Sequence, residues 1–312
     1  MIAFVFPGQG SQHVGMGRDY VRHEPDVFEE LFMVAQEALG FDIKQYCLYG
    51  PMETLTSTEI AQPAILTISV GIHRLLVQKN ITPAYVAGHS VGQFSALVAA
   101  GSLSFADALQ IVHQRGKSMQ SVTRKGTMLA VVSSQVERMQ KVLVTAADHS
   151  VEVAAHNSPQ QIVFSGEIEK IKAFQTALDS EMGIRTRLLQ VSQAFHSSLM
   201  EEMESEFMNF VQQFPIADPT IPVVLNCSAT STLQREDILE DIRLQCTYPV
   251  LWRQTMEFLH DAGVYSLIEV GPNRTLTGFM RAFGYDHIWT YTTDRAVRLK
   301  KNMRAFQEII KK

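Results

Sequence analysis

The sequence predicts an α/β protein in which a smaller α/β unit interrupts a larger one. Along most of the chain, short apolar runs typical of buried strands alternate with helix-forming segments. Between residues 125 and 193 the predicted order becomes strand, helix, strand, strand, helix, strand, which is the split βαβ or ferredoxin-like pattern. We therefore expect a large domain made of residues 1–124 and 194–312, with residues 125–193 inserted as a small ferredoxin-like domain.

The first part of the large domain begins with a strand. Residues 2–6, I-A-F-V-F, are continuously apolar and are closed by P-G-Q-G, as expected for a strand buried on both faces. A helical pattern covers residues 25–39, and residues 80–88 combine a turn with a second short apolar strand. Residues 94–100, F-S-A-L-V-A-A, are helix-forming. This region therefore predicts strand, helix, strand, helix.

The remaining strands and helices are predicted from the same two patterns, short apolar runs for strands and helical spacing of apolar residues for helices. In the small domain the expected strands are residues 127–133, 151–155, 161–166 and 186–192, and the expected helices are residues 135–147 and 168–178. Beyond it we expect a helix, a strand, a helix, a strand and a basic C-terminal helix, at residues 201–214, 221–226, 252–263, 265–272 and 298–312.

Composition is that of an ordinary soluble globular protein. Apolar residues make up 46% and charged residues 19%, and the net charge of −5 gives no electrostatic reason to bind nucleic acid. Cys47, Cys227 and Cys246 lie far apart without C-x-x-C spacing, so no metal site is expected. The N-terminus lacks the basic region of a signal peptide. No segment is expected to reach the roughly 18 apolar residues that span a bilayer. We therefore expect a cytoplasmic protein without a membrane partner.

One motif points to chemistry. Residues 88–92, G-H-S-V-G, place Ser90 in a G-x-S-x-G frame between a predicted strand and a predicted helix, which is the context of a nucleophile elbow. A serine hydroxyl needs a base within hydrogen-bond reach. Among ten histidines, His196 stands out because it lies where the inserted unit returns to the large domain, and domain junctions favour ligand pockets. The motif alone does not say whether an acyl group goes to water, to another carrier, or nowhere.

Eight ordered motifs extend this pattern over nearly the whole chain. They are F-P-G-Q-G-S-Q (6–12), Q-P-A (62–64), G-H-S-V-G (88–92), Q-R-G-K-S-M-Q (114–120), N-S-P (157–159), A-F-H-S (194–197), Q-C-T-Y-P-V-L-W (245–252), and E-V-G-P with L-T-G (269–278). In these motifs the chain resembles the malonyl-CoA:acyl-carrier-protein transacylases and the similar stand-alone acyltransferases of polyketide synthases. The resemblance implies an α/β-hydrolase-like large domain with a ferredoxin-like small domain.

The resemblance also implies roles for the site residues. Ser90 corresponds to the nucleophile and His196 to the general base, which later acts as general acid. Gln245 occupies the position whose carbonyl orients the histidine, so a neutral acceptor replaces the acid of a Ser-His-Asp triad. The backbone N–H groups of Gln9 and Val91 correspond to the oxyanion hole, a device that commonly contributes about 3 kcal/mol to the transition state.

The same resemblance identifies substrate-binding residues. Arg115, which follows Ser90 by 25 residues in Q-R-G-K-S-M-Q, corresponds to a guanidinium that grips the free carboxylate of a malonyl group. Taken alone, an arginine in such a segment is more often a surface or salt-bridged residue. Phe195 corresponds to the bulky residue that goes with malonyl rather than methylmalonyl units, while Gln62 and Asn157 correspond to pocket-lining positions.

Two positions depart from the family pattern. Gln93 stands where a glutamate is common, just after the elbow, and lies outside the catalytic trio. Gln193 stands where a histidine is common, in the signature that precedes His196, and leaves the choice of extender unit more open.

These observations predict a malonyltransferase that works in two steps through a seryl ester. It would take malonyl-CoA and the phosphopantetheine thiol of an acyl carrier protein as substrates and would need no metal or bound cofactor. One alternative is a hydrolase that clears acyl groups from carrier proteins, and it is disfavoured because neutral acyl chains give no role to Arg115. A second alternative is an inactive docking scaffold, disfavoured because nucleophile, base and orienting residue are all present.

Overall fold

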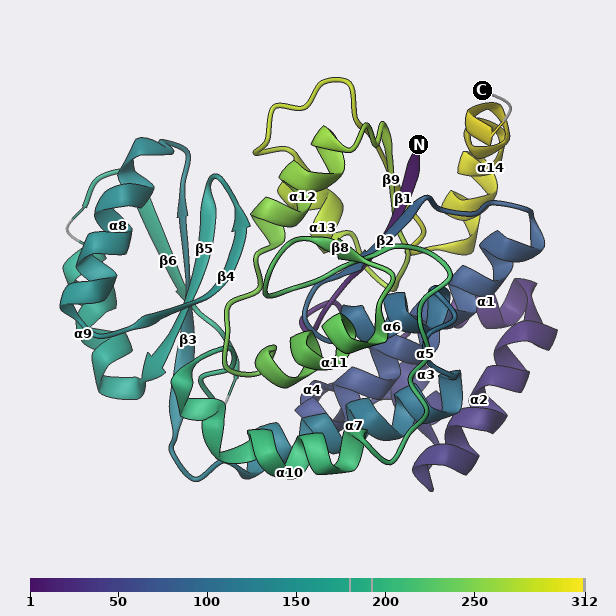
Figure 1. The fold of residues 1–312 in the computed structure, drawn as a ribbon, viewed down its shortest axis with the longest axis horizontal. Coiled ribbons are helices and arrows are strands. Elements are labelled where there is room, and N and C mark those ends of the chain that lie inside the picture. Colours follow the sequence, from purple (N-terminus) through teal and green to yellow (C-terminus); the bar gives the residue numbers. More distant parts are fainter. Residues whose placement is uncertain (180, 192, 311–312) are drawn as a thin grey trace.

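The structure is a computed structural model that describes residues 1–179, 181–191 and 193–310. Its strands form one six-stranded sheet in the order β10-β9-β1-β2-β7-β8 and one four-stranded sheet in the order β4-β5-β3-β6. Figure 1 shows the four-stranded sheet with α8 and α9 as a lobe at the left of the molecule, beside the larger body that contains the six-stranded sheet.

The six-stranded sheet is parallel except at one edge. β1 lies in its middle, parallel to β2 on one side and to β9 on the other, and only β8 runs antiparallel to its neighbour. The strands are β1 (Ile2–Phe6), β2 (Tyr85–Gly88), β7 (Val223–Val224), β8 (Ser231–Thr232), β9 (Ser266–Glu269) and β10 (Trp289–Thr292). Every residue of β1 is buried, so its continuous apolar sequence is explained by burial on both faces.

Helices surround this sheet, with α1 to α7 gathered at the lower right of Figure 1 and α12 above. The first group is α1 (Arg18–His23), α2 (Pro25–Leu39), α3 (Ile43–Tyr49), α4 (Met52–Thr56), α5 (Thr58–Gln78), α6 (Gly92–Ala99) and α7 (Phe105–Ser121). The second group is the 3₁₀ turn η1 (Ser198–Met200) followed by α10 (Glu201–Val211), α11 (Arg235–Leu244), α12 (Trp252–Asp261), α13 (Thr275–Met280) and α14 (Ala296–Ile310).

The four-stranded sheet has the element order expected from the sequence. It is built from β3 (Gly126–Ser133), α8 (Glu137–Asp148), β4 (Glu152–Ser158), β5 (Gln161–Glu167), α9 (Ile168–Asp179) and β6 (Ile184–Leu188). Its strand pairs are all antiparallel, and its own apolar core includes Leu129, Phe164 and Phe174. At the β4 edge, Val250 of the larger body exchanges backbone hydrogen bonds with Ala154 and His156, so the two units are joined directly.

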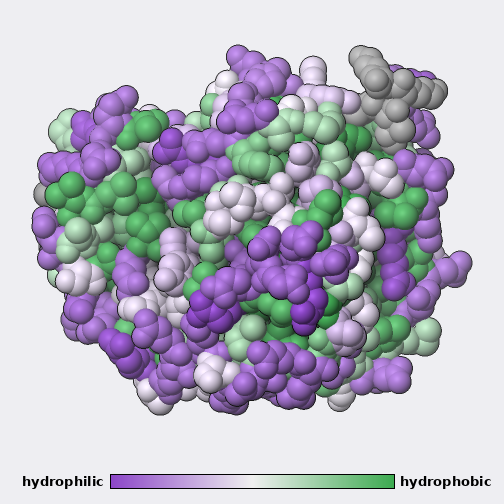
Figure 2. All heavy atoms as spheres, viewed as in Figure 1, coloured by the Kyte–Doolittle hydropathy of each residue, from purple (hydrophilic) through white to green (hydrophobic). Residues whose placement is uncertain are grey.

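The surface in Figure 2 reflects this division. On the face shown, hydrophilic residues gather over α11 near the centre, and a group of hydrophobic residues lies over the four-stranded lobe at the left. Helix α11 carries several exposed acidic and basic residues in its sequence R-E-D-I-L-E-D-I-R-L.

Two expected strands and one expected absence differ most clearly from the structure. The strand expected over residues 221–226 is only two residues long, because the chain leaves the sheet at Leu225. The strand expected over residues 186–192 ends at Leu188, and residue 192 lies outside the described residues. The expectation that no segment is long and apolar enough to cross a bilayer was wrong for α5, although 89% of its apolar window is buried inside the protein, which is how a core helix of a globular domain appears.

Candidate active site

Ser90 lies on a sharp turn between β2 and α6. Its φ of 52° is in the left-handed region, where a side-chain-bearing residue is strained. The flanking glycines are required by space, since a Cβ on Gly88 would lie 2.0 Å from the carbonyl carbon of Gly92, and a Cβ on Gly92 would lie 2.2 Å from the carbonyl oxygen of Phe6. The strand–turn–helix context predicted for the G-x-S-x-G frame is therefore present.

His196 meets Ser90 directly. Its Nε2 lies 2.8 Å from the Ser90 Oγ, and its Nδ1 lies 2.6 Å from the backbone carbonyl oxygen of Gln245 and 3.3 Å from that of Tyr248. A carbonyl only accepts, so Nδ1 carries the proton and the lone pair of Nε2 faces the serine hydroxyl. Burial, and then the positive charge of Arg115, lower the pKa of His196 to about 3. The ring is therefore neutral, as a general base must be.

Arg115 reaches the same point from α7. Its side chain is 1% exposed. One terminal nitrogen donates to the Gln62 Oε1 at 3.0 Å, and the other donates to the Gln245 Oε1 at 2.9 Å and to the Ser90 Oγ at 3.2 Å. Its Nε is buried without a hydrogen-bond partner, and no acidic side chain pairs with it within the described part of the chain. A buried guanidinium without a carboxylate is costly, so the site is prepared for an anion placed close to Ser90.

The predicted oxyanion-hole residues lie beside the serine. Gln9 follows the carboxyl end of β1, and Val91 directly follows Ser90. Among the described residues, no acceptor is assigned to the backbone N–H of either residue. The Gln9 side chain donates a 3.2 Å hydrogen bond to the Thr58 hydroxyl. An oxyanion hole requires N–H groups without an internal acceptor, so the oxyanion-hole expectation stays a prediction that this geometry allows.

The other predicted residues lie at different distances from the chemistry. Gln62 of α5 contacts Arg115 directly. Asn157 of β4 contacts His89, the residue before Ser90, and its Oδ1 lies 2.8 Å from the His89 Nε2. Phe195 is buried in the apolar core next to His196. The structure thus links Ser90, His196, Gln245, Arg115 and Gln62 in one connected set of hydrogen bonds, while Asn157 reaches the site only through His89.

Three further polar residues support the site and were not identified as site residues from the sequence. Asn226 accepts the backbone N–H of Ser90 at 2.8 Å and donates to the Gly88 carbonyl at 2.8 Å. Gln93 donates to the Asp241 Oδ2 at 2.7 Å. The departure at position 93 was a signal in the sequence, but nothing local indicates that Asn226 and Asp241, more than 130 residues away, complete the arrangement.

The second departure from the family pattern has a structural contact as well. The amide nitrogen of Gln193 donates to the backbone carbonyl of Val122 at 2.9 Å and to that of Gln120 at 3.3 Å. Both carbonyls lie at the end of α7, the helix that carries Arg115. Gln193 therefore fixes the chain that leads to His196 against that helix.

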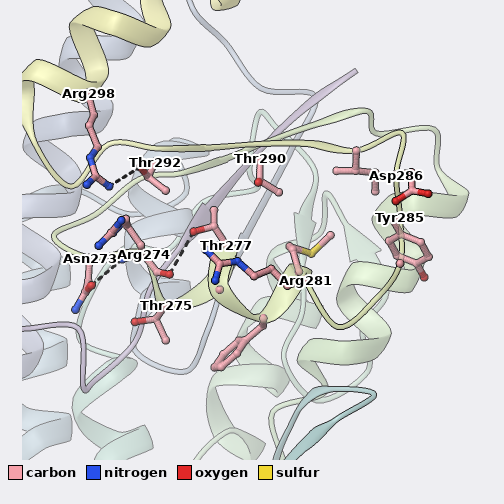
Figure 3. A pocket seen from close by; sticks show the side chains of 15 residues that line it. Asn273, Arg274, Thr275, Thr277, Arg281, Tyr285, Asp286, Thr290, Thr292 and Arg298 are labelled. Atoms are coloured by element: carbon pink, nitrogen blue, oxygen red, sulfur yellow. Dashed lines mark hydrogen bonds between the residues drawn. The ribbon is translucent and has the colours of Figure 1, made fainter. Parts of the chain in front are cut away.

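One pocket opens at Gln9, and a second lies around α13 and β10. A pocket of about 470 Å³ is lined by Gln9, Thr58 and Gln120, so it opens beside one predicted oxyanion-hole residue. A second pocket of about 780 Å³ lies around α13 and β10, and Figure 3 shows the side chains of Arg274, Arg281 and Arg298 around it. Phe279, which also lines it, lies 6.5 Å from the ring of His89.

No group of three or more histidine, cysteine, aspartate or glutamate side chains that could hold a metal ion occurs in the described ranges. The three cysteines are free thiols, with Cys47 and Cys246 buried.

Comparison with known proteins identifies the family. Residues 3–310 match the model of the acyl transferase domain. A malonyl CoA-acyl carrier protein transacylase of Bacillus subtilis is 37% identical over 295 residues, which cover 93% of this chain and 73% of the relative. The polyketide biosynthesis malonyl CoA-acyl carrier protein transacylase BaeC of Bacillus velezensis is 36% identical over 282 residues, covering 90% of this chain and 96% of the relative.

A solved structure agrees over the whole fold. The complex of a type II PKS acyl-carrier protein with its malonyl-transacylase superposes with a TM-score of 0.90 at 32% sequence identity and covers 97% of this chain and 99% of that one. The elbow at Ser90, the neutral histidine beside it and these similarities lead to one conclusion: the chain belongs to the acyl transferase family, among the malonyl CoA-acyl carrier protein transacylases.

Proposed function

We propose that this chain is a malonyl-CoA:acyl-carrier-protein S-malonyltransferase of fatty-acid or polyketide synthesis. The observation that carries the proposal is the buried Arg115 guanidinium, which has no carboxylate partner among the described residues and lies 3.2 Å from the hydroxyl of Ser90. In a malonyl thioester one methylene separates the free carboxylate from the reacting carbonyl. A cation this close to the nucleophile therefore fits that acyl group.

The first step forms the acyl-enzyme. The Ser90 Oγ attacks the thioester carbonyl of malonyl-CoA while the His196 Nε2, 2.8 Å away, takes the hydroxyl proton. The backbone N–H groups of Gln9 and Val91 receive the tetrahedral oxyanion. The carbon–sulfur bond then breaks, His196 returns the proton to the CoA sulfur, and a malonyl ester remains on Ser90.

The second step reverses the first with a different thiol. The phosphopantetheine thiol of the acyl carrier protein attacks the ester, His196 takes the thiol proton, and the proton passes to the departing Ser90 Oγ. The Gln245 carbonyl, 2.6 Å from the His196 Nδ1, holds the ring in the required tautomer throughout. CoA and phosphopantetheine are substrates in this scheme, and no bound cofactor or metal enters it.

Each substrate-binding residue has its own role. Arg115 grips the malonyl carboxylate through charge-assisted hydrogen bonds, and Gln62 holds the guanidinium in place. Phe195 limits the room next to His196, so a branching methyl group is disfavoured by about 1–3 kcal/mol. Asn157 shapes the pocket through His89. Arg274, Arg281 and Arg298 line the larger pocket, where Arg274 and Arg298 both pair with Asp294.

The two-unit architecture fits this use. We assign residues 1–124 and 194–312 to an α/β-hydrolase-like catalytic domain and residues 125–193 to a ferredoxin-like domain, supported by the parallel six-stranded sheet and by the βαββαβ order of the antiparallel one. His196 then lies where the small domain returns to the large one. The cytoplasmic location expected from the sequence stays a prediction.

A hydrolase is the main rival, and one experiment separates the two activities. The enzyme is loaded with radiolabelled malonyl-CoA, freed of excess substrate, and divided between buffer and a solution of holo acyl carrier protein. We expect the label to move to the carrier protein and to persist on the enzyme in buffer. Release of free malonate at the same rate in both samples would establish a hydrolase instead.

A further inference from the structure

A row of buried hydrogen bonds leads from the arginine of the site to a carboxylate. Arg115 donates to the Gln245 Oε1 at 2.9 Å, Gln245 donates to the Gln93 Oε1 at 2.9 Å, and Gln93 donates to the Asp241 Oδ2 at 2.7 Å. None of the four side chains is more than 3% exposed. Every donor points away from the guanidinium, so both amide dipoles are aligned between a cation and an anion, the arrangement in which such chains strengthen one another.

The direction of this row is fixed by the backbone of the elbow. The Asn226 side chain accepts the N–H of Ser90 and donates to the carbonyl of Gly88, and those backbone groups can act only as donor and acceptor respectively. The Asn226 nitrogen therefore also faces Gln93, to whose Oε1 it donates. Because the Gln93 oxygen is turned toward Asn226 and Gln245, its nitrogen must face Asp241.

Asp241 is surrounded by donors. Besides Gln93, the backbone N–H of Cys227 donates to its Oδ1 at 2.8 Å and the backbone N–H of Asn226 donates to its Oδ2 at 3.2 Å. An ionised carboxylate accepts all of these bonds, whereas a proton on either oxygen would take up one of its acceptor positions and weaken it as an acceptor. Burial raises the pKa of Asp241 above its ordinary value, and the bonds from Cys227, Gln93 and Asn226 offset this effect only in part.

This environment explains why position 93 holds an amide. A glutamate there would satisfy Asn226 and Gln245 equally well, but its second oxygen would lie about where Nε2 is now, 2.7 Å from the Asp241 carboxylate. Two carboxylates at that distance in a buried site cannot both be ionised. The negative charge of this network therefore comes from Asp241 on α11. Gln93 on α6 links that charge, through Gln245, to Arg115.

We propose that Asp241 and Gln93 are positioning residues for acyl transfer: Asp241 is the buried counter-charge of Arg115, linked to it through Gln93 and Gln245, and the same pair holds Asn226 against the backbone of Ser90. The inference rests on the proposed function, because it assigns Arg115 to the malonyl carboxylate. The hydrogen bonds that link Asp241 to Arg115 orient the guanidinium before the substrate binds, which lowers the entropic cost of binding.

The test is an exchange of charge between the two positions. Asp241→Asn leaves one oxygen to serve three donors, and Gln93→Glu creates the buried carboxylate pair, so each single variant is expected to lose about 10-fold or more in kcat/KM for malonyl-CoA. The double variant Gln93→Glu/Asp241→Asn returns one carboxylate and one amide to the network. We expect it to recover to within about 3-fold of the wild type, a coupling that independent sites do not show.

A second readout separates positioning from general structure. The ratio of malonyl to acetyl loading on Ser90 should fall in both single variants and return in the double variant, because only malonyl uses Arg115. Asp237→Asn, an exposed aspartate on the same helix, is the matched control and should keep the wild-type ratio. If a charged variant does not fold, Gln93→Met breaks the row without adding a charge and should lower the ratio by itself.

Wild-type ratios in Asp241→Asn or Gln93→Met, or a double variant no better than the product of its singles, would overturn this inference. The proposed function has a separate criterion: if the wild-type enzyme forms no malonyl ester on Ser90, that function fails whatever the variants do.

Discussion

The two sheets of this protein differ in the residues that they bring together. The six-stranded sheet is parallel around β1, and the segments that follow its strands carry polar groups: Gln9 after β1, Ser90 after β2 and Asn226 after β7. The four-stranded sheet is antiparallel and packs an apolar core that includes Leu129 and Phe174. The polar groups around Ser90 therefore lie in the unit with the parallel sheet, and the unit with the antiparallel sheet supplies the chain that leads to His196.

Strand direction explains the difference. Parallel strands end at the same edge of a sheet, so loops from distant parts of the chain meet there, which is where ligands bind in open α/β sheets. The buried polar groups at this edge satisfy one another, as Asn226 does for the backbone of Ser90. In an antiparallel sheet successive strand ends alternate between two edges, so fewer loops converge and packing dominates.

The largest expected effect is in the parallel unit. Ser90→Ala removes the only group in the proposed scheme that becomes acylated, so we expect no covalent adduct and a loss of about 10⁴-fold or more in transfer. Intact-mass spectrometry after incubation with malonyl-CoA measures the adduct. Detection of a malonyl adduct on this variant would place the nucleophile elsewhere.

A cavity made in the core of the antiparallel unit should lower stability and leave acylation nearly unchanged. Phe174 is fully buried and packs edge-on against Phe164 with 4.9 Å between ring centroids. Phe174→Ala should reduce the free energy of unfolding by about 3–5 kcal/mol, measured by urea denaturation, while acylation per folded molecule stays near wild type. A loss of acylation at wild-type stability would mean that this unit takes part in the chemistry.

Arg115 is expected to discriminate between substrates. Arg115→Ala should reduce malonyl loading by about 100-fold, because it removes charge-assisted hydrogen bonds to the substrate carboxylate, and should spare or improve acetyl loading. Arg124→Ala, whose side chain is 59% exposed, is the matched control and should load both groups normally. Equal losses for malonyl and acetyl would contradict the carboxylate role.

The smallest effect concerns pH. The pKa of His196 is lowered to about 3 in the free enzyme, so the neutral base is present throughout the range between about pH 5 and 8 in which an ordinary histidine titrates. The pH profile of kcat/KM, which reports the free enzyme, should therefore show no fall near the ordinary pKa of histidine. An acidic limb centred near pH 6.5 that disappears in a variant of His196 would disprove the environment described for it.

The fold could be predicted from sequence where the signal is local. The βαββαβ order and the elbow at Ser90 follow from short apolar runs, helical spacing and glycines that are adjacent in the chain. Helix α5 gave no amphipathic signal because most of its residues are buried, and it contains Pro63. The two-residue length of β7 depends on where the chain leaves the sheet, which no local pattern encodes.

The site residues also differ in whether the local sequence indicates them. Ser90 is indicated by its own neighbours and His196 by its place at the domain junction, whereas Gln245 and Arg115 were assigned by resemblance to a family. Asp241 and Asn226 could not be found in this manner, because each acts through side-chain contacts with residues far away in the chain. Gln93 stood out as a departure, but its meaning required the position of Asp241.

The most direct test of the account is a competition on the wild-type enzyme. Equal concentrations of malonyl-CoA and acetyl-CoA are added without a carrier protein, and the acyl-enzyme is digested and mapped by mass spectrometry. We expect a malonyl ester on Ser90 in large excess over acetyl. Predominant acetylation of Ser90, or a malonyl group attached to any other residue, would contradict it.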